Sequence, residues 1–106
     1  MTTALAEYEK LQHGFSGIEG VSAGQMFGKA CLKIGGKAFV AQHKDTVVFK
    51  LSGTDHAKAI GNVGAVLWDP SGKGRPMKEW VALTIEYRAQ FKTLTTAAMV
   101  YVRSIG

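Results

Sequence analysis

The sequence predicts an α+β domain: an antiparallel five-stranded sheet with helices packed on one face. Short runs of alternating apolar and polar residues, joined by two-residue turns, are typical of hairpin-linked antiparallel strands. A run near the C-terminus, with apolar residues three and four positions apart, is typical of an amphipathic helix. The expected element order is α-β-β-β-α-β-β-α, within one domain that covers residues 1–106.

Three successive strands are expected between Gly28 and Leu51. The first alternates between an apolar set and a lysine-rich set, Ala30, Leu32 and Ile34 against Lys29, Cys31 and Lys33. The Gly35-Gly36 pair suits a tight turn into the second strand, residues 37–42. The third strand, residues 46–51, places Val47, Phe49 and Leu51 on one face. Such a meander commonly has one face on the core and the other in water.

The rest of the chain supplies the remaining elements. A first helix is expected over residues 3–13, with Gly14 as its stop, followed by a glycine-rich linker over residues 15–24. A short helix over residues 52–61 would turn Ala57 and Ile60 inward. Strands are expected over residues 63–68 and 77–83, on either side of a turn-rich loop over residues 69–76.

The C-terminal helix has the clearest pattern in the chain. Its apolar residues are spaced alternately four and three apart: Tyr87, Phe91, Leu94, Ala98, Tyr101 and Ile105. This spacing makes one continuous stripe on a helix of about five turns. Thr84 is the expected N-cap. Because Thr95 and Thr96 are mediocre helix formers, packing rather than intrinsic propensity has to hold this helix.

Positive charge is concentrated on the meander. The net charge is +5, but residues 1–22 carry three glutamates against one lysine, whereas residues 23–50 carry five lysines against one aspartate. The candidate contacts for an anion or a nucleic acid are Lys29, Lys33, Lys50, Lys73 and Arg75. Clustered cations suit phosphate contacts, and stacking of bases would need exposed aromatics, here Phe39 or Trp80. The alternative without a binding function is a solvent-exposed sheet face, whose lysines keep the protein in solution and prevent its edge strands from pairing with another chain.

No catalytic or metal-binding signature stands out, so no cofactor and no metal are expected. Residues 24–30 have a phosphate-loop appearance but lack the required spacing and the Ser or Thr that binds magnesium. The three histidines lie on different elements without ligand spacing, and each is expected at the surface. Cys31 beside two lysines suggests a reactive thiol, but a buried structural cysteine is the preferred interpretation.

Cysteine content and the distribution of apolar residues indicate in which cellular compartment the protein is expected. A single cysteine excludes an internal disulfide and agrees with a reducing compartment. The N-terminus lacks the pattern of a secretory signal, and no apolar run reaches the roughly 18 residues of a membrane span. We therefore expect a cytoplasmic protein that does not cross a membrane.

A series of short motifs suggests a family. They are Met26-Phe27-Gly28, the Gly35-Gly36 turn, Phe39-Val40-Ala41, Lys50, and Gly74-Arg75-Pro76 followed by Met77 and Trp80. Over roughly residues 3–106 they resemble the N-terminal domain of the TfoX (Sxy) family, and more weakly YjbR-like domains. Gln25 and Lys29 depart from the pattern, which leads us to expect Arg and Gly there. The resemblance implies the α+β fold and relates the chain to bacterial regulators of competence.

Three hypotheses on function stay open. The full-length regulators carry a second, C-terminal domain that is absent from this sequence, so a competence role does not transfer directly. The first hypothesis is a small non-enzymatic regulatory domain that binds a protein partner or a second copy of itself. The second is non-specific nucleic-acid binding through the lysine-rich face, without a recognition helix for sequence readout. The third is a small-ligand binder or enzyme with a pocket between the sheet and the last helix.

Overall fold

The structure, a computed structural model, describes residues 2–105 and has the predicted α+β class. The helices of this range are α1 (Ala4–Phe15), α2 (Gly53–Ile60), the 3₁₀ helix η1 (Ile85–Tyr87) and α3 (Arg88–Ile105). The strands are β1 (Val21–Met26), β2 (Lys29–Ile34), β3 (Lys37–His43), β4 (Thr46–Lys50), β5 (Val66–Trp68) and β6 (Met77–Thr84). All neighbouring strands pair antiparallel, in the order β1-β2-β3-β4-β6-β5.

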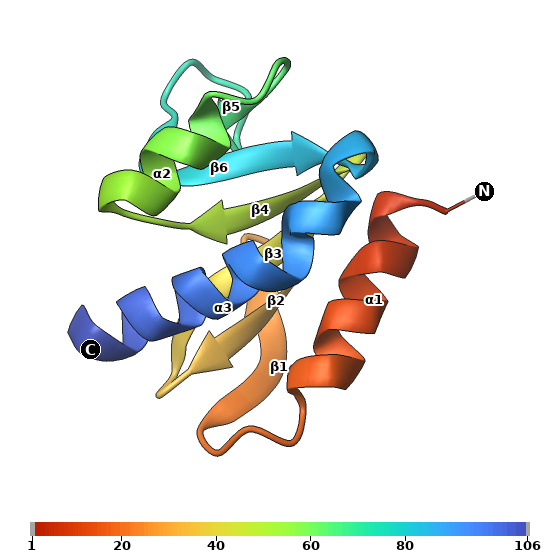
Figure 1. Cartoon of the computed structure of the whole chain (residues 1–106), viewed down its shortest axis with the longest axis vertical. Coiled ribbons are helices and arrows are strands. Elements are labelled where there is room, and N and C mark those ends of the chain that lie inside the picture. Colours follow the sequence, from red (N-terminus) through yellow and green to blue (C-terminus); the bar gives the residue numbers. More distant parts are fainter. Residues whose placement is uncertain (1, 106) are drawn as a thin grey trace.

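The helices lie on one side of the sheet, as predicted, with α1 and α3 side by side across its centre (Figure 1). The main core fills this layer. It joins the inward faces of the two helices to the strand residues that the alternation predicted, among them Leu32, Ile34, Val47, Phe49 and Leu51. The Phe49 and Phe91 rings meet here, with centroids 5.3 Å apart. The hydrophobic pattern therefore fixes which face of the meander is inward, because a slip of one residue would turn the apolar set outward.

The sheet has six strands and not five, because the expected linker contains β1. The alternation in Val21–Met26 is weak and none of its residues is fully buried, but the strand pairs with β2 along its whole length. α1 also continues through Gly14 to Phe15, so Gly14 is not the stop that its residue type suggested. The Thr3 hydroxyl oxygen begins this helix by accepting a hydrogen bond of 3.1 Å from the Ala6 amide.

Two further details differ from the expectations. β5 is confined to Val66–Trp68, because Val63 and Gly64 belong to the preceding turn. In α2 the buried residue is Ala59, and Ile60 packs against the main core as expected, whereas Ala57 is exposed.

The apolar stripe of α3 is confirmed at its centre but drifts at its end. Its buried residues are Phe91, Leu94, Thr95, Ala98, Met99 and Val102, while Ile105 is exposed. The buried face also includes Thr95, Met99 and Val102, which lie beside the predicted stripe, because burial follows the surface that the helix presents to the sheet. Thr84 is the N-cap of η1, which leads into α3, but its side chain makes no capping hydrogen bond.

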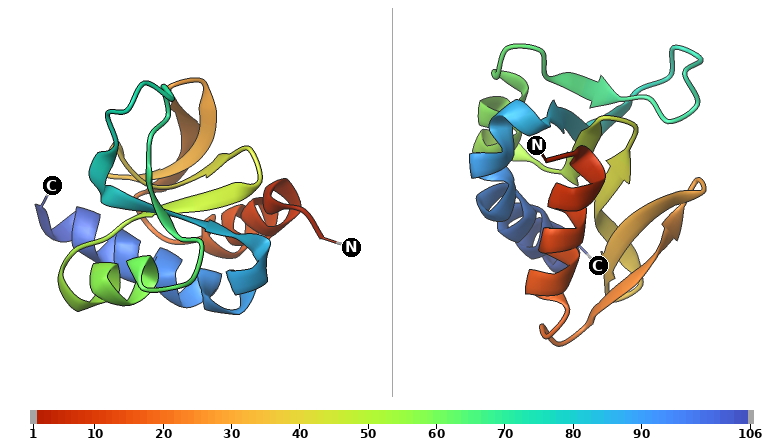
Figure 2. Two further views of the ribbon diagram at one scale, coloured as in Figure 1. Left: turned by 90° about the horizontal axis from the view of Figure 1, so that it is seen from above. Right: turned by 90° about the vertical axis from the view of Figure 1, so that its right-hand side faces the viewer.

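The opposite face of the sheet, which we call the helix-free face, is not simply solvated. It carries a second buried cluster of Cys31, Ala41, Val48, Trp68, Trp80 and Ala82, with Met26, Ala38 and Met77 packed at its margin. The β1–β2 hairpin and the loop between β5 and β6 both extend on this side of the sheet, away from α1 and α3 (Figure 2). This face therefore combines a small core with two projecting segments.

Candidate functional site

Three of the five predicted contact residues occupy strand positions of the helix-free face. Lys29 and Lys33 flank the buried Cys31 on β2, and Lys33 is paired with Ala38, which packs against the second cluster. Lys50 lies two residues beyond the buried Val48 and is opposite Trp80 on β6. All three lysines are half-buried, which indicates that their aliphatic stems cover the cluster while the ammonium groups reach water.

The surroundings of these lysines differ. The Lys50 ammonium lies 4.0 Å from the Glu79 carboxylate, so its charge is partly compensated. The Lys33 side chain extends across Gly24 of the neighbouring strand, where an added Cβ would come within 3.2 Å of Lys33 Cε. Gly24 therefore leaves room for that side chain. Neither Lys29 nor Lys33 has a carboxylate within ion-pair distance in residues 2–105.

Lys73 and Arg75 lie apart from this group, on the exposed loop between β5 and β6. The Asp69 carboxylate organises the loop, accepting hydrogen bonds from the Gly72 amide (3.1 Å) and the Gly74 amide (2.8 Å). A backbone amide that already donates to an internal carboxylate does not offer itself to an outside anion. The two cationic side chains are therefore what this loop can contribute to such a contact.

The exposed aromatic of the helix-free face is Phe27, and neither Phe39 nor Trp80 is available for stacking. Phe39 is fully buried in the main core and Trp80 is 4% exposed, whereas Phe27 is 64% exposed. Phe39 faces the helices because a bulge between Leu32 and Lys33 shifts the register of β2 against β3. The expectation for Phe39 was wrong for that reason, and the expectation for Trp80 was wrong because its ring packs against Trp68 in the second cluster.

Phe27 is held at the tip of the β1–β2 hairpin in an unusual backbone conformation. Its φ is 54°, and that of Gly28 is 74°. Tight hairpin turns need positive φ at both central residues, and Asn-Gly or Gly-Gly is the usual solution. A bulky side chain in the left-handed region is a clear outlier, and such strain tends to occur at functional positions. A phenylalanine directly before glycine in a two-residue turn was the sequence signal for this residue.

His43 and Trp68 add a polar element beside the cluster. Their rings are in edge contact, with centroids 5.8 Å apart, and both line a shallow cavity of about 210 Å³. His43 Nδ1 and Trp68 Nε1 are buried without a hydrogen-bond partner among the described residues. Burial, then the ammonium groups of Lys29 and Lys44, lower the pKa of His43. His43 is thus not the simple surface histidine that was expected.

Cys31 matches the structural interpretation. Its side chain is fully buried, and burial raises the pKa of the thiol even though Lys33 lies near. The neutral thiol is a poor nucleophile, so this cysteine is not set up for catalysis.

Two features are absent from residues 2–105. No group of three His, Cys, Asp or Glu side chains in this range is arranged to hold a metal ion. No helix in the same range is long and apolar enough to cross a membrane.

Comparison of the chain with protein-family models, with curated proteins and with solved structures gave no match. The resemblance to the TfoX N-terminal domain therefore stays a prediction. The function of the helix-free face has to follow from the chemistry of its own residues.

Proposed function

We propose that this chain is a small, non-enzymatic binding domain that holds single-stranded nucleic acid against its helix-free face. The observation that carries the proposal is that Lys29 and Lys33 lie on the same face of β2 as the buried Cys31, and that the exposed ring of Phe27 packs against Trp68 of the same cluster. Lysines on neighbouring positions of a sheet can follow a phosphate backbone, and an exposed aromatic gives a base a surface for stacking. Lys50, Lys73 and Arg75 extend the positive charge on the same side.

A single strand suits this face better than a duplex. The described helices lie on the other side of the sheet, so no recognition helix among them is presented to a major groove (Figure 2). One exposed ring and several lysines provide contacts that every nucleotide can make, which favours binding without sequence preference. A regulatory role in the cytoplasm, as the TfoX resemblance implies, is compatible with such binding.

Fluorescence anisotropy with a labelled oligothymidine strand and a matched duplex, at several salt concentrations, tests this proposal. For single strands, the slope of log affinity against log salt concentration is about −0.7 per neutralised phosphate. If each of the three lysines neutralises one phosphate, the slope should be about −2. Replacing Lys29, Lys33 and Lys50 by Glu should abolish binding. The matched control reverses the exposed Lys58, Lys92 and Arg103 on the helix side and should bind more weakly but measurably. Equal loss in both variants, or no binding at low salt, would refute the proposal.

A second candidate, association with a protein or a second copy of this chain, is favoured by the edge strand β1. This strand pairs with β2 on one side only, and none of its six residues carries a charge. Natural edge strands usually carry lysine or proline, which prevents pairing with another chain. β1 lacks both, so an antiparallel strand can add to it.

Sedimentation velocity over a range of concentrations distinguishes this second candidate. Wild-type protein should form dimers as its concentration rises, and Ala23→Lys should stay monomeric because two lysines would face each other near the centre of a self-paired strand. A monomer at every concentration would exclude self-association through β1.

A further inference from the structure

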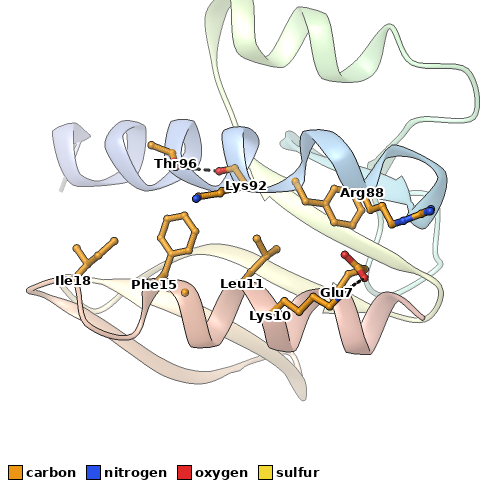
Figure 3. A pocket seen from close by; sticks show the side chains of 10 residues that line it. Glu7, Lys10, Leu11, Phe15, Ile18, Arg88, Lys92 and Thr96 are labelled. Atoms are coloured by element: carbon orange, nitrogen blue, oxygen red, sulfur yellow. Dashed lines mark hydrogen bonds and ion pairs between the residues drawn. The ribbon is translucent and has the colours of Figure 1, made fainter. Parts of the chain in front are cut away.

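A groove runs between α1 and α3, on the opposite side of the molecule from the helix-free face. Its volume is about 460 Å³, which is within the usual range for small-molecule pockets. The side chains that line it come from both helices and from the turn after α1, as Figure 3 shows for Leu11, Phe15, Ile18, Arg88 and Lys92. It differs from the pocket expected from the sequence, which was placed between the sheet and α3.

The floor of the groove is apolar. Leu11 and Phe15 of α1 point toward α3 (Figure 3), and Phe91 of α3 lines the groove as well. These three side chains belong to the main core, so the groove exposes only their outer edges. Ile18 continues the apolar surface at the end of α1. A ligand in this position would make its main contacts through an apolar body.

The rim is positively charged. Arg88 and Lys92 are one helical turn apart on α3, and within residues 2–105 neither has a carboxylate within ion-pair distance. The carboxylate of the groove, Glu7, is already engaged by the Lys10 ammonium at 2.9 Å and the Thr2 hydroxyl at 2.6 Å. The charged residues of the rim are therefore three cations, Lys10, Arg88 and Lys92, and one carboxylate, Glu7. The rim has a net positive charge.

Gly14 opens the groove without being required by the backbone. It lies within α1 and is absent from the positive-φ residues, so an alanine would adopt the same conformation. A Cβ added here would meet nothing within 4 Å. Glycine inside a helix costs stability compared with alanine. The missing side chain therefore leaves space beside Phe15 that packing within the chain does not use.

We infer that this groove is a binding site for a small amphipathic anion, a carboxylate or sulfonate attached to an aromatic or aliphatic body. The apolar body lies on Leu11, Phe15 and Phe91, next to the space at Gly14. The acidic group lies at the rim and contacts either Lys92 or Arg88, whose charged groups point toward opposite ends of the groove (Figure 3). Guanidinium and ammonium donors form strong charge-assisted hydrogen bonds to such a group. The site is independent of the proposed nucleic-acid face, since the two share no residue.

A pair of fluorescent probes tests both halves of this inference. Anilinonaphthalene sulfonate has the required acidic group and aromatic body, and phenylnaphthylamine is the same body without the charge. The sulfonate should bind the folded protein at least about tenfold more tightly than the uncharged probe. Amide chemical shifts in a ¹H–¹⁵N spectrum should change along α1 and the first half of α3.

Variants separate the roles of space and charge. Gly14→Leu should fill the groove and weaken binding of both probes, whereas Arg88→Gln with Lys92→Gln should weaken only the sulfonate, by about tenfold. Arg103→Gln removes an exposed charge near the end of α3 and serves as control. If Gly14→Leu does not fold, the double variant Arg88→Gln with Lys92→Gln still tests whether the two cations bind the acidic group. Equal affinity for the two probes, or shifts confined to the helix-free face, would overturn the inference.

Discussion

The exposed ring of Phe27 meets the buried indole of Trp68 nearly edge-on, with ring centroids 6.2 Å apart and an interplanar angle of 68°. Trp68 in turn packs against Trp80 at 5.2 Å. The tip of the β1–β2 hairpin is thereby linked to β5, at the opposite edge of the sheet. This contact explains how a phenylalanine in a left-handed conformation keeps a defined position although most of its surface is in water.

Replacing Phe27 by Asn should leave the fold almost as stable as before. Relief of the left-handed conformation favours the variant by about 1–2 kcal/mol, and loss of the edge contact costs about 0.5–1.5 kcal/mol. The net change in the free energy of unfolding, measured with urea, should fall between a loss of about 0.5 kcal/mol and a gain of about 1.5 kcal/mol. Affinity for single-stranded DNA should fall nonetheless, because the exposed ring is gone. An unchanged affinity would remove Phe27 from the proposed site.

Gly14→Ala should stabilise the protein by about 0.5–1 kcal/mol, because it removes the cost of glycine in a helix and its methyl group has open space. Urea denaturation measures the effect. Gly36→Ala is the matched control, since Gly36 has a φ of 82° and a methyl group added there would also have open space. It should destabilise by about 1–2 kcal/mol. Destabilisation by Gly14→Ala would show that the position is not an ordinary helical one.

The free energy of unfolding should fall as the pH drops below 6.5, the ordinary pKa of histidine. Burial and the nearby Lys29 and Lys44 lower the pKa of His43 from that value, with Asp45 acting weakly in the other direction. The unfolded chain then binds more protons than the folded one between the lowered pKa and 6.5. Stability is therefore fully present above this window and declines within it.

Urea denaturation across this pH window, on wild-type protein and His43→Gln, measures the effect. The variant should lose the slope in this window, whereas His13→Gln, on the exposed side of α1, should retain it. Glu7 contributes separately, at a lower pH. The Thr2 hydroxyl and the Lys10 ammonium lower the pKa of its carboxyl below 4.5, so its stabilising effect is lost only in more acidic solution. A slope that survives in His43→Gln would assign the effect to another group.

The Cys31 thiol should not react with iodoacetamide in the native protein. It is fully buried and burial raises its pKa, so both access and thiolate concentration are low. Mass spectrometry should show one modification in urea and none without it. Rapid labelling of the native chain would mean that the second cluster opens readily. Cys31→Ser should destabilise by about 1–3 kcal/mol, because a hydroxyl is buried among apolar groups.

The pattern of apolar and polar residues predicted correctly the buried faces of several strands and of the C-terminal helix. Alternation along β2 and β4 predicted their inward faces, and the spacing of Phe91, Leu94 and Ala98 predicted the buried side of α3. The same reasoning missed β1, because Val21–Met26 is uncharged but barely alternates. An edge strand such as β1 is stabilised mainly by backbone hydrogen bonds to its neighbour. Backbone hydrogen bonds do not require alternating apolar side chains, so the sequence pattern does not reveal the strand.

The sequence by itself determined the α+β class, the meander, the C-terminal helix and the concentration of lysines on one side of β2, since each follows from periodicity along a single segment. The tertiary structure decided which residues from distant segments meet. It brought Phe27 to Trp68, buried Trp80 and Phe39, occupied the loop amides with Asp69, and placed Gly14 opposite Arg88 and Lys92. Such contacts depend on strand order and on how the helices cross the sheet, and neither is encoded in the period of any one segment.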